Sequence, residues 1–393
     1  MATRTVEARA RNLRPRRDAE LLGVAAFARS LDWVLLVAVG TIVAYGLWSV
    51  DSITRNDPGG SLAGRQGAYV ALGAGAMVAV AALDPGRLRR AMWPIYGGTL
   101  GMMLLVLVSA AATRGSRRWI DIGFFKFQPS EFGKVLFTLF LAAFLADRAR
   151  VIGSLRVPLH AIALATAPIV LVFLQPDLGT ALVYSAALAA VLFVSGVRWV
   201  HLGAIGVLAL LGILAVLWWL PSVGVQVLKP YQTERLTGFT HPESDPRDAT
   251  YNVNQSITAV GAGGLHGRGV AGATQTRLNY LPEHATDFAF ASLAEQRGFF
   301  GASILLLLYL LVVWRGLKIV TSARDLFCAV VAGGLVFAFL FQVFVNVGMT
   351  IGIAPITGIP LPFVSVGGSS MITNLVAIGI LLGIHARSVR RRA

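Results

Sequence analysis

Residues 325–347, DLFCAVVAGGLVFAFLFQVFVNV, decide the fold class, because this long apolar stretch carries a single charged side chain, Asp325 at its start. About 20 residues that rise about 1.5 Å each cross a hydrocarbon layer about 30 Å thick. Composition agrees, with 56% hydrophobic and 13% charged residues and a mean hydropathy of +0.70. We predict an all-α polytopic membrane protein with about ten transmembrane helices. The other apolar runs lie near residues 32–50, 67–83, 92–111, 131–146, 157–173, 178–196, 200–219, 300–314 and 370–386.

The distribution of positive charge predicts the topology. The net charge is +15, and Lys and Arg gather in the N-terminal tail, in the second, fourth and eighth loops and at the C-terminus. With ten spans these segments share one side, so the positive-inside rule makes both termini cytoplasmic. The charge therefore reflects orientation and contact with anionic lipid, and no nucleic-acid partner is expected. The predicted parts are a basic cytoplasmic tail over 1–28, a single transmembrane domain over 29–388 with a large extracytoplasmic loop at 220–300 between helices 7 and 8, and a cytoplasmic tail over 389–393.

One predicted outer loop, residues 112–130, breaks this charge rule. It carries Arg114, Arg117, Arg118 and Lys126 on the side where cations are unusual. A bound anion would explain them, and anchoring to lipid headgroups is the alternative. The single cysteine and the six histidines show no pattern of a disulfide or of a zinc site built from protein ligands.

Polar residues form clusters on the predicted outer side, in segments 117–134, 175–180, 220–288 and 342–370. Pro129 suits the first turn of a helix, where Glu131 and Lys134 share a face and can form an ion pair. Asp177 can serve the site or simply cap the following helix. The many prolines and glycines of 355–369 fit irregular backbone that lines a cavity, or a plain loop.

The large loop ends in Tyr-Leu-Pro-Glu-His-Ala-Thr-Asp-Phe, residues 280–288, where the chain turns back toward the membrane. A carboxylate near a low-dielectric boundary is costly, and it marks transport, proton handling or catalysis. We interpret Asp287 as a catalytic base, and a helix N-cap is the structural alternative.

Taken together and in order, these clusters resemble the SEDS (shape, elongation, division and sporulation) family over about residues 30–388. The segments that carry the resemblance are Phe-Gln-Pro-Ser-Glu at 127–131, Gln-Pro-Asp-Leu-Gly-Thr at 175–180, Pro-Glu-His-Ala-Thr-Asp-Phe-Ala-Phe at 282–290 and Pro-Leu-Pro-Phe-Val-Ser-Val-Gly-Gly-Ser-Ser at 360–370. Leu-Ala-Glu at 293–295 and the short N-terminal tail look more like the elongation branch than the division branch. The chain departs from the family pattern at Ala285, where a histidine is usual, and at Val366, where an aromatic residue is common.

The resemblance implies an inverting peptidoglycan glycosyltransferase of the bacterial inner membrane, active in cell elongation. It would polymerise lipid II and release undecaprenyl diphosphate, with Asp287 as the general base. Cations would stabilise the leaving diphosphate: the candidates are Arg117, Arg118, Lys126 and Lys134, with Arg65 of the first outer loop as a further one. By the resemblance, the other residues lining the cavity around Asp287 would be Arg118, Lys126, Glu131, Lys134, Asp177 and Gln232. The implied partners are a class B penicillin-binding protein, which supplies the transpeptidase, and other membrane proteins of the elongation complex.

Several alternatives stay open from the sequence. No cofactor is required by the residues, although a divalent cation, Mg²⁺ or Mn²⁺, could be shared with the diphosphate. A lipid II flippase, or another transporter of a lipid-linked substrate, would also carry intramembrane charges and broken helices. A scaffold that only anchors partner proteins is the third reading, which the exposed ionisable residues disfavour.

Overall fold

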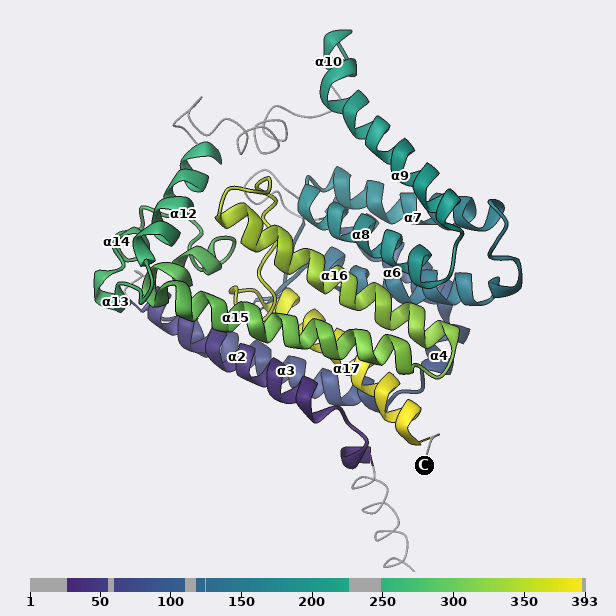
Figure 1. Ribbon diagram of the computed structural model, residues 1–393, viewed down its shortest axis with the longest axis horizontal. Coiled ribbons are helices and arrows are strands. Elements are labelled where there is room, and N and C mark those ends of the chain that lie inside the picture. Colours follow the sequence, from purple (N-terminus) through teal and green to yellow (C-terminus); the bar gives the residue numbers. More distant parts are fainter. Residues whose placement is uncertain (1–26, 56–59, 110–117, 124, 226–248, 391–393) are drawn as a thin grey trace, which may run out of the picture.

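The computed structural model describes residues 27–55, 60–109, 118–123, 125–225 and 249–390. Its long helices run side by side in one bundle, and only a two-residue hairpin interrupts the all-α architecture among these residues (Figure 1). The bundle helices are α2 (Trp33–Thr54), α3 (Ala63–Ala82), α5 (Met92–Ser109), α6 (Pro129–Ala146), α7 (Arg156–Leu174), α8 (Leu178–Val194), α15 (Ala289–Ser322), α16 (Leu326–Thr350) and α17 (Gly368–Arg390).

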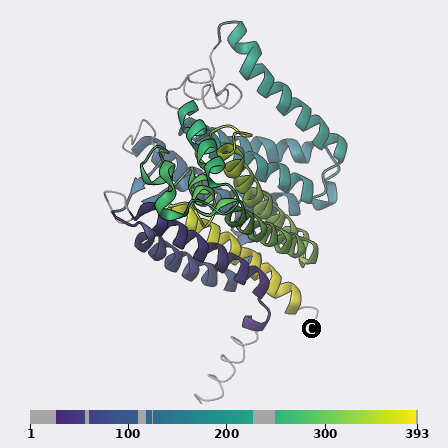
Figure 2. The ribbon, with the colours of Figure 1, turned by 60° about the vertical axis from the view of Figure 1, so that its left-hand side comes forward.

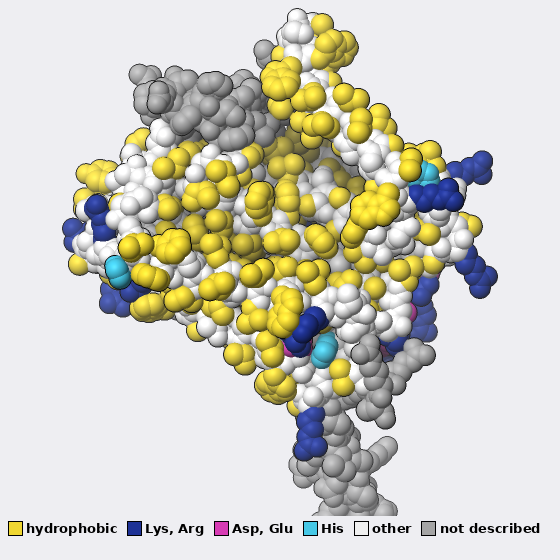
Figure 3. All heavy atoms as spheres, viewed as in Figure 1, with side chains coloured by type: hydrophobic (Ala, Val, Ile, Leu, Met, Phe, Trp, Pro, Cys, Tyr) yellow, Lys and Arg dark blue, Asp and Glu magenta, His cyan; other side chains and the backbone are white. Residues whose placement is uncertain are grey.

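The described residues of every predicted apolar run lie mainly on one of these helices or on α9 (Trp199–Leu214) and the turn that continues it. Within the described residues, seven helices are long and apolar enough to cross a membrane, and α5 and α8 contribute two shorter apolar segments. The prediction of a helical membrane protein is therefore confirmed, while the number of spans stays a prediction. Hydrophobic side chains cover the middle of the face seen in Figure 3, and Lys and Arg gather toward its ends.

The bundle core is built around α6, α16 and α17, the most buried of the described spans. α17 packs on α3, and α16 packs on α8 and α15. α16 is apolar on its buried faces and also on the side where Leu340 and Phe344 stay exposed, as expected for a helix whose uncovered side faces lipid. α9 is the opposite case, because none of its residues is buried and it leans away from the bundle in two views (Figures 1 and 2).

Short elements connect the bundle helices. On one side of the bundle lie α4 (Pro85–Arg90) and a 3-10 turn at Ala149–Val151. A π-helical turn at Ala215–Trp219 and α10 (Leu220–Ser222) continue α9. Among its described residues, the interval 220–300 predicted as the large loop contains α10, the start of α15 and three further helices: α12 (Ala249–Gly263), α13 (Gly269–Gly272) and α14 (Thr274–Arg277).

α15 begins before its apolar run and is broken at Gly298, which has φ 67° and ψ −166°. The backbone groups freed by this break bond to the turn at 264–268: the N–H of Phe299 donates to the Gly264 carbonyl at 2.8 Å, and that of Arg268 donates to the Glu295 carbonyl at 2.9 Å. A β-carbon on Gly298 would lie 2.3 Å from the Gly267 nitrogen, so only glycine allows this approach. The loop is thereby fixed to the first turns of α15.

Aspartates begin the helices at the end of the bundle where the described chain starts and stops. Asp32 caps α2 and pairs with Arg315 of α15, whose Nη2 lies 2.6 Å from its carboxylate. Asp325 caps α16 by accepting from the Cys328 N–H at 2.9 Å. Burial raises the pKa of Asp325, but hydrogen bonds from Cys328 and Arg324 outweigh burial and hold this pKa below its usual range.

Candidate functional site

Asp287 lies just before α15, in a segment that hydrogen bonds hold on both sides. Asn346 of α16 donates from Nδ2 to the Asp287 carbonyl at 2.9 Å and to the Ile359 carbonyl at 2.7 Å. The amide N–H of Val366 donates to the Ala285 carbonyl at 2.9 Å. These contacts join the segment that ends in Asp287 to the Pro- and Gly-rich segment 355–367. The Asp287 residue itself remains partly exposed.

The segment 360–367 has its own internal support. The Ser365 hydroxyl donates to the Thr286 carbonyl and accepts from the Leu361 N–H, the latter at 2.9 Å. Gln66 of α3 donates from Nε2 to the Ser365 carbonyl at 3.0 Å and accepts from the Gly367 N–H at 3.2 Å. Irregular backbone inside a membrane protein must satisfy its polar groups through protein partners, as here. The loop beside Asp287 is therefore rigid by construction.

Segment 117–134 meets this loop at Ser369. The Ser369 hydroxyl donates to the Lys126 carbonyl at 2.8 Å and accepts from the Gln128 N–H at 2.9 Å. β1 (Ile120–Asp121) and β2 (Lys126–Phe127) form the short antiparallel hairpin that presents Lys126. The Lys126 side chain is exposed. A cation is thus fixed next to the loop that carries the Asp287 segment.

Arg65 of α3 is connected to the segment that carries Lys126. Its Nη2 donates to the Tyr69 hydroxyl at 3.3 Å. The Tyr69 ring packs edge-on against Phe125, with 5.8 Å between ring centres, and Phe125 directly precedes Lys126. Arg65 is exposed like Lys126, so these two predicted phosphate ligands can both reach a bound molecule.

The predicted ion pair of α6 is present. Lys134 Nζ lies 2.7 Å from Glu131 Oε2, and the side chains are 6% and 3% exposed. A buried pair of this kind stabilises only when its remaining donors and acceptors are satisfied. Pro129 occupies the first turn of α6, as the sequence predicts. Tyr184 of α8 donates to the Ser130 carbonyl at 2.9 Å and so fixes this turn.

Asp177 and Arg118 lie together at the turn between α7 and α8. Asp177 caps α8 through the Thr180 N–H at 3.1 Å and accepts from Gln128 Nε2 at 3.0 Å. Arg118 Nη1 lies 3.8 Å from the Asp177 carboxylate, and its other nitrogens donate to the carbonyls of Gln175 and Pro176. The capping alternative for Asp177 is therefore confirmed. Arg118 serves this turn first, and any contact with a ligand comes in addition.

The described parts of the four polar clusters thus form one connected structure. Gln128 joins segment 117–134 to Asp177, Ser369 joins it to the loop, and Ser365 joins the loop to the Asp287 segment. Two predicted site residues, Arg117 and Gln232, lie outside the described residues. Across the described ranges, no three His, Cys, Asp or Glu side chains gather as a metal-binding group.

Two contributors to this site were not singled out from the sequence. Gln66 lies beside Arg65, just before the apolar run 67–83, and nothing in its local sequence marks it. Glu295 is fully buried in α15 and accepts from the backbone N–H groups of Gln275 and Thr276, each at 2.9 Å. It also accepts from the Thr276 hydroxyl at 2.7 Å. Glu295 thereby fastens α14, and with it the approach to Asp287, onto the bundle.

Fold and site together define a polytopic membrane protein with a polar site at one end of the bundle that combines the partly exposed Asp287 with exposed cations. The FtsW/RodA/SpoVE family model, described as a cell cycle protein, matches residues 29–390. The chain belongs to this family.

The chain is similar to several known proteins over about nine tenths of its length. The chain is 38% identical over 357 residues to the peptidoglycan glycosyltransferase MrdB of Escherichia coli, covering 90% of this chain and 93% of that protein. It is similar to a chain from a structure of a peptidoglycan synthase complex that coordinates polymerization and crosslinking, with TM-score 0.77, 33% identity and coverage of 91% and 98%. It is also similar to the crystal structure of the rod shape determining protein RodA of Thermus thermophilus, with TM-score 0.65, 31% identity and coverage of 90% and 96%.

Proposed function

We infer that this chain is a peptidoglycan glycosyltransferase that polymerises lipid II into glycan strands during cell elongation. The observation that carries the proposal is the shared anchoring of two backbone segments: Ser365 donates to the carbonyl of Thr286, which precedes Asp287, and Ser369 donates to the Lys126 carbonyl, so a carboxylate and an exposed cation share one support. Family membership supports the same activity. Related chains of similar length are named as peptidoglycan glycosyltransferases.

In the proposed reaction, the Asp287 carboxylate accepts the proton of the acceptor sugar 4-hydroxyl. The hydroxyl oxygen then bonds to the donor anomeric carbon on the face opposite the diphosphate. The anomeric carbon–oxygen bond breaks, and its electron pair leaves with the undecaprenyl diphosphate. A single displacement of this kind inverts the anomeric configuration and needs no enzyme nucleophile. A positioned base contributes a rate factor of about 100 to 10,000.

The cations have different proposed roles. Arg65 and Lys126 are exposed and suit the diphosphate oxygens, for which charged hydrogen bonds are strong. Lys134 is buried with Glu131 and extends the positive field without direct access to solvent. A divalent cation, Mg²⁺ or Mn²⁺, would add positive charge at the diphosphate. Gln232 is proposed as a further contact to the substrate.

The proposed setting is the bacterial inner membrane with both termini in the cytoplasm. Figure 1 places the described start and the C-terminus at one end of the bundle, away from α12, α13 and α14. The chain has no transpeptidase motif of the Ser-x-x-Lys type in its outer clusters, so crosslinking calls for a partner. We expect a class B penicillin-binding protein to take this role; a similar chain belongs to a peptidoglycan synthase complex that coordinates polymerization and crosslinking.

The decisive experiment compares purified wild type, Asp287→Asn and Glu283→Gln with labelled lipid II. Glu283 is the matched control, because it is an exposed carboxylate in the same turn. Loss of glycan polymer in Asp287→Asn alone, with lipid II binding retained, is the expected result. A flippase, the second candidate, would instead lose transfer of lipid II across vesicles while polymer formation is absent in every variant. Polymerisation at the wild-type rate by Asp287→Asn would refute the assignment of the base.

A further inference from the structure

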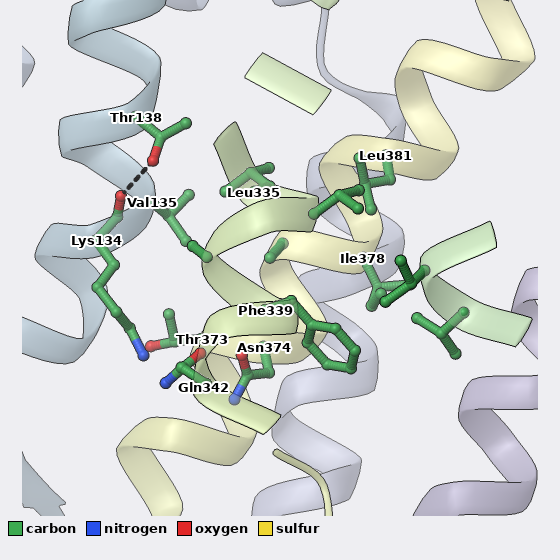
Figure 4. A pocket seen from close by; sticks show the side chains of 15 residues that line it. Lys134, Val135, Thr138, Leu335, Phe339, Gln342, Thr373, Asn374, Ile378 and Leu381 are labelled. Carbon is green, nitrogen blue, oxygen red and sulfur yellow. Dashed lines mark hydrogen bonds between the residues drawn. The ribbon is translucent and has the colours of Figure 1, made fainter. Parts of the chain in front are cut away.

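A small cavity lies beside the Glu131–Lys134 pair, among α6, α15, α16 and α17. It has a volume of about 30 Å³. One end is apolar, with Leu335, Ile378 and Leu381, and the other end is polar (Figure 4). Figure 4 shows Lys134, Gln342, Thr373 and Asn374 gathered at that polar end. Because about 10–15 Å³ suffices for one water molecule, the cavity has room for about two.

Two polar atoms in this cavity have no protein partner. Gln342 Nε2 and Thr373 Oγ1 are buried and form no hydrogen bond with any of the described residues. Their residues are only 2% and 1% exposed. An unsatisfied buried donor is costly, so such atoms usually bond to water. Two independent helices, α16 and α17, therefore direct unsatisfied groups at one space.

Lys134 also has N–H donors without an acceptor among the described residues. An ammonium has three N–H donors, and the hydrogen bond that the described residues offer it is the one to Glu131 Oε2. The residue is 5% exposed, so bulk water does not supply the other acceptors. A water molecule accepts two hydrogen bonds and donates two. It can therefore accept from Lys134 and Gln342 and donate to Thr373.

Charge balance selects the ligand. The Glu131–Lys134 pair is neutral as a whole, so an added chloride or metal ion would leave a net charge in the low-dielectric interior. Water adds no charge and matches the mixture of donors and a hydroxyl. We propose that this cavity is a built water site, and that Gln342 and Thr373 are positioning residues that hold Lys134 through the bound water.

The consequence for activity rests on the proposed function. A bound water keeps the Lys134 ammonium oriented by Glu131 on one side and by α16 and α17 on the other. Without it, two N–H groups of a buried cation are unsatisfied and the lysine changes rotamer or pulls solvent inward. The positive field of Lys134 at the outer site is then no longer fixed in place.

The first test is structural and needs no enzymatic activity. A high-resolution structure of the full chain in lipid nanodiscs should show water density within hydrogen-bond distance of Lys134, Gln342 and Thr373. The density should weaken in Thr373→Val, which preserves the side-chain volume and removes the hydroxyl. An empty cavity in wild type would overturn the proposal. A bromide peak in crystals grown with bromide in place of chloride would also overturn it, since the site would then be an anion site.

The second test measures lipid II polymerisation by the same variants. We expect Thr373→Val and Gln342→Leu to lower kcat about tenfold with little change in KM, and Thr373→Ser to restore it. Ile378→Val is the matched control at the apolar end of the same cavity and should retain wild-type kcat. Equal losses in Ile378→Val and Thr373→Val would assign the effect to packing and overturn the positioning role. If wild type forms no polymer, the proposed function fails, while the water density still decides the water site.

Discussion

Replacing Glu295 by alanine should weaken the attachment of α14 to α15. The Glu295 carboxylate is fully buried and accepts three hydrogen bonds from Gln275 and Thr276. Each hydrogen bond to a charged group contributes about 1.5 kcal/mol or more, so the three sum to about 4.5 kcal/mol. Part of this is recovered when the freed N–H groups reach water, and we expect a net loss of about 3 kcal/mol. The change acts on α14 and on the segment up to Asp287.

The assay combines thermal unfolding in detergent with hydrogen–deuterium exchange. Glu295→Ala should lower Tm by about 5 °C and speed exchange over residues 274–288, while α16 keeps its protection. Glu295→Gln keeps one carbonyl oxygen, so its Tm and its exchange rate should lie between those of wild type and Glu295→Ala. The exposed Glu283→Gln should behave as wild type. Unchanged exchange at 274–288 in Glu295→Ala would refute the view that this carboxylate fastens the loop.

Three further substitutions test the support of Asp287, the break in α15 and the cap of α16. Asn346→Leu removes the amide that holds the Asp287 carbonyl, and polymerisation of labelled lipid II should fall about 10- to 100-fold with Tm lowered only slightly; an unchanged rate would show that this carbonyl needs no support. Gly298→Ala should destabilise the protein by about 2 kcal/mol, because the new β-carbon meets the Gly267 nitrogen at a positive φ; a Tm equal to wild type would contradict this. The lowered pKa of Asp325 contributes stability above about pH 4 that is lost as pH falls through the folded-state pKa, so Tm measured from pH 6 to 3 should fall less in Asp325→Asn than in wild type.

Hydropathy, residue spacing and helix-capping preferences predicted much of the structure from the sequence. Apolar runs located the bundle helices, since length and hydropathy leave few other structures in a membrane. Spacing alone predicted the Glu131–Lys134 pair, and the cap rule identified Asp177 as one of two alternatives. These features depend on residues close together in the chain, and their physics is visible in a short window.

The contacts that assemble the site were beyond such rules. Gln66 lies some 300 positions from the Ser365 carbonyl that it binds, and no periodicity connects the two. Glu295 was noted only within Leu-Ala-Glu at 293–295 as a family signal, and its structural role was hidden because its partners lie in α14. The break of α15 at Gly298 was hidden for the same reason, since the groups that compensate it belong to another segment. Long-range hydrogen bonds are specified by packing, which a single sequence does not display.

The segment Trp199–Ser222 has a length that bears on its environment. Its 24 residues span about 36 Å, against roughly 30 Å of hydrocarbon. A span that is too long tilts, and among the described residues no side chain of α9 is fully buried against a neighbour. We expect bilayer thickness to influence the inclination of α9, so thin membranes should tilt it more and thick ones should draw it upright. Acyl chain length thereby becomes a variable that adjusts one wall of the protein while the rest of the bundle stays as it is.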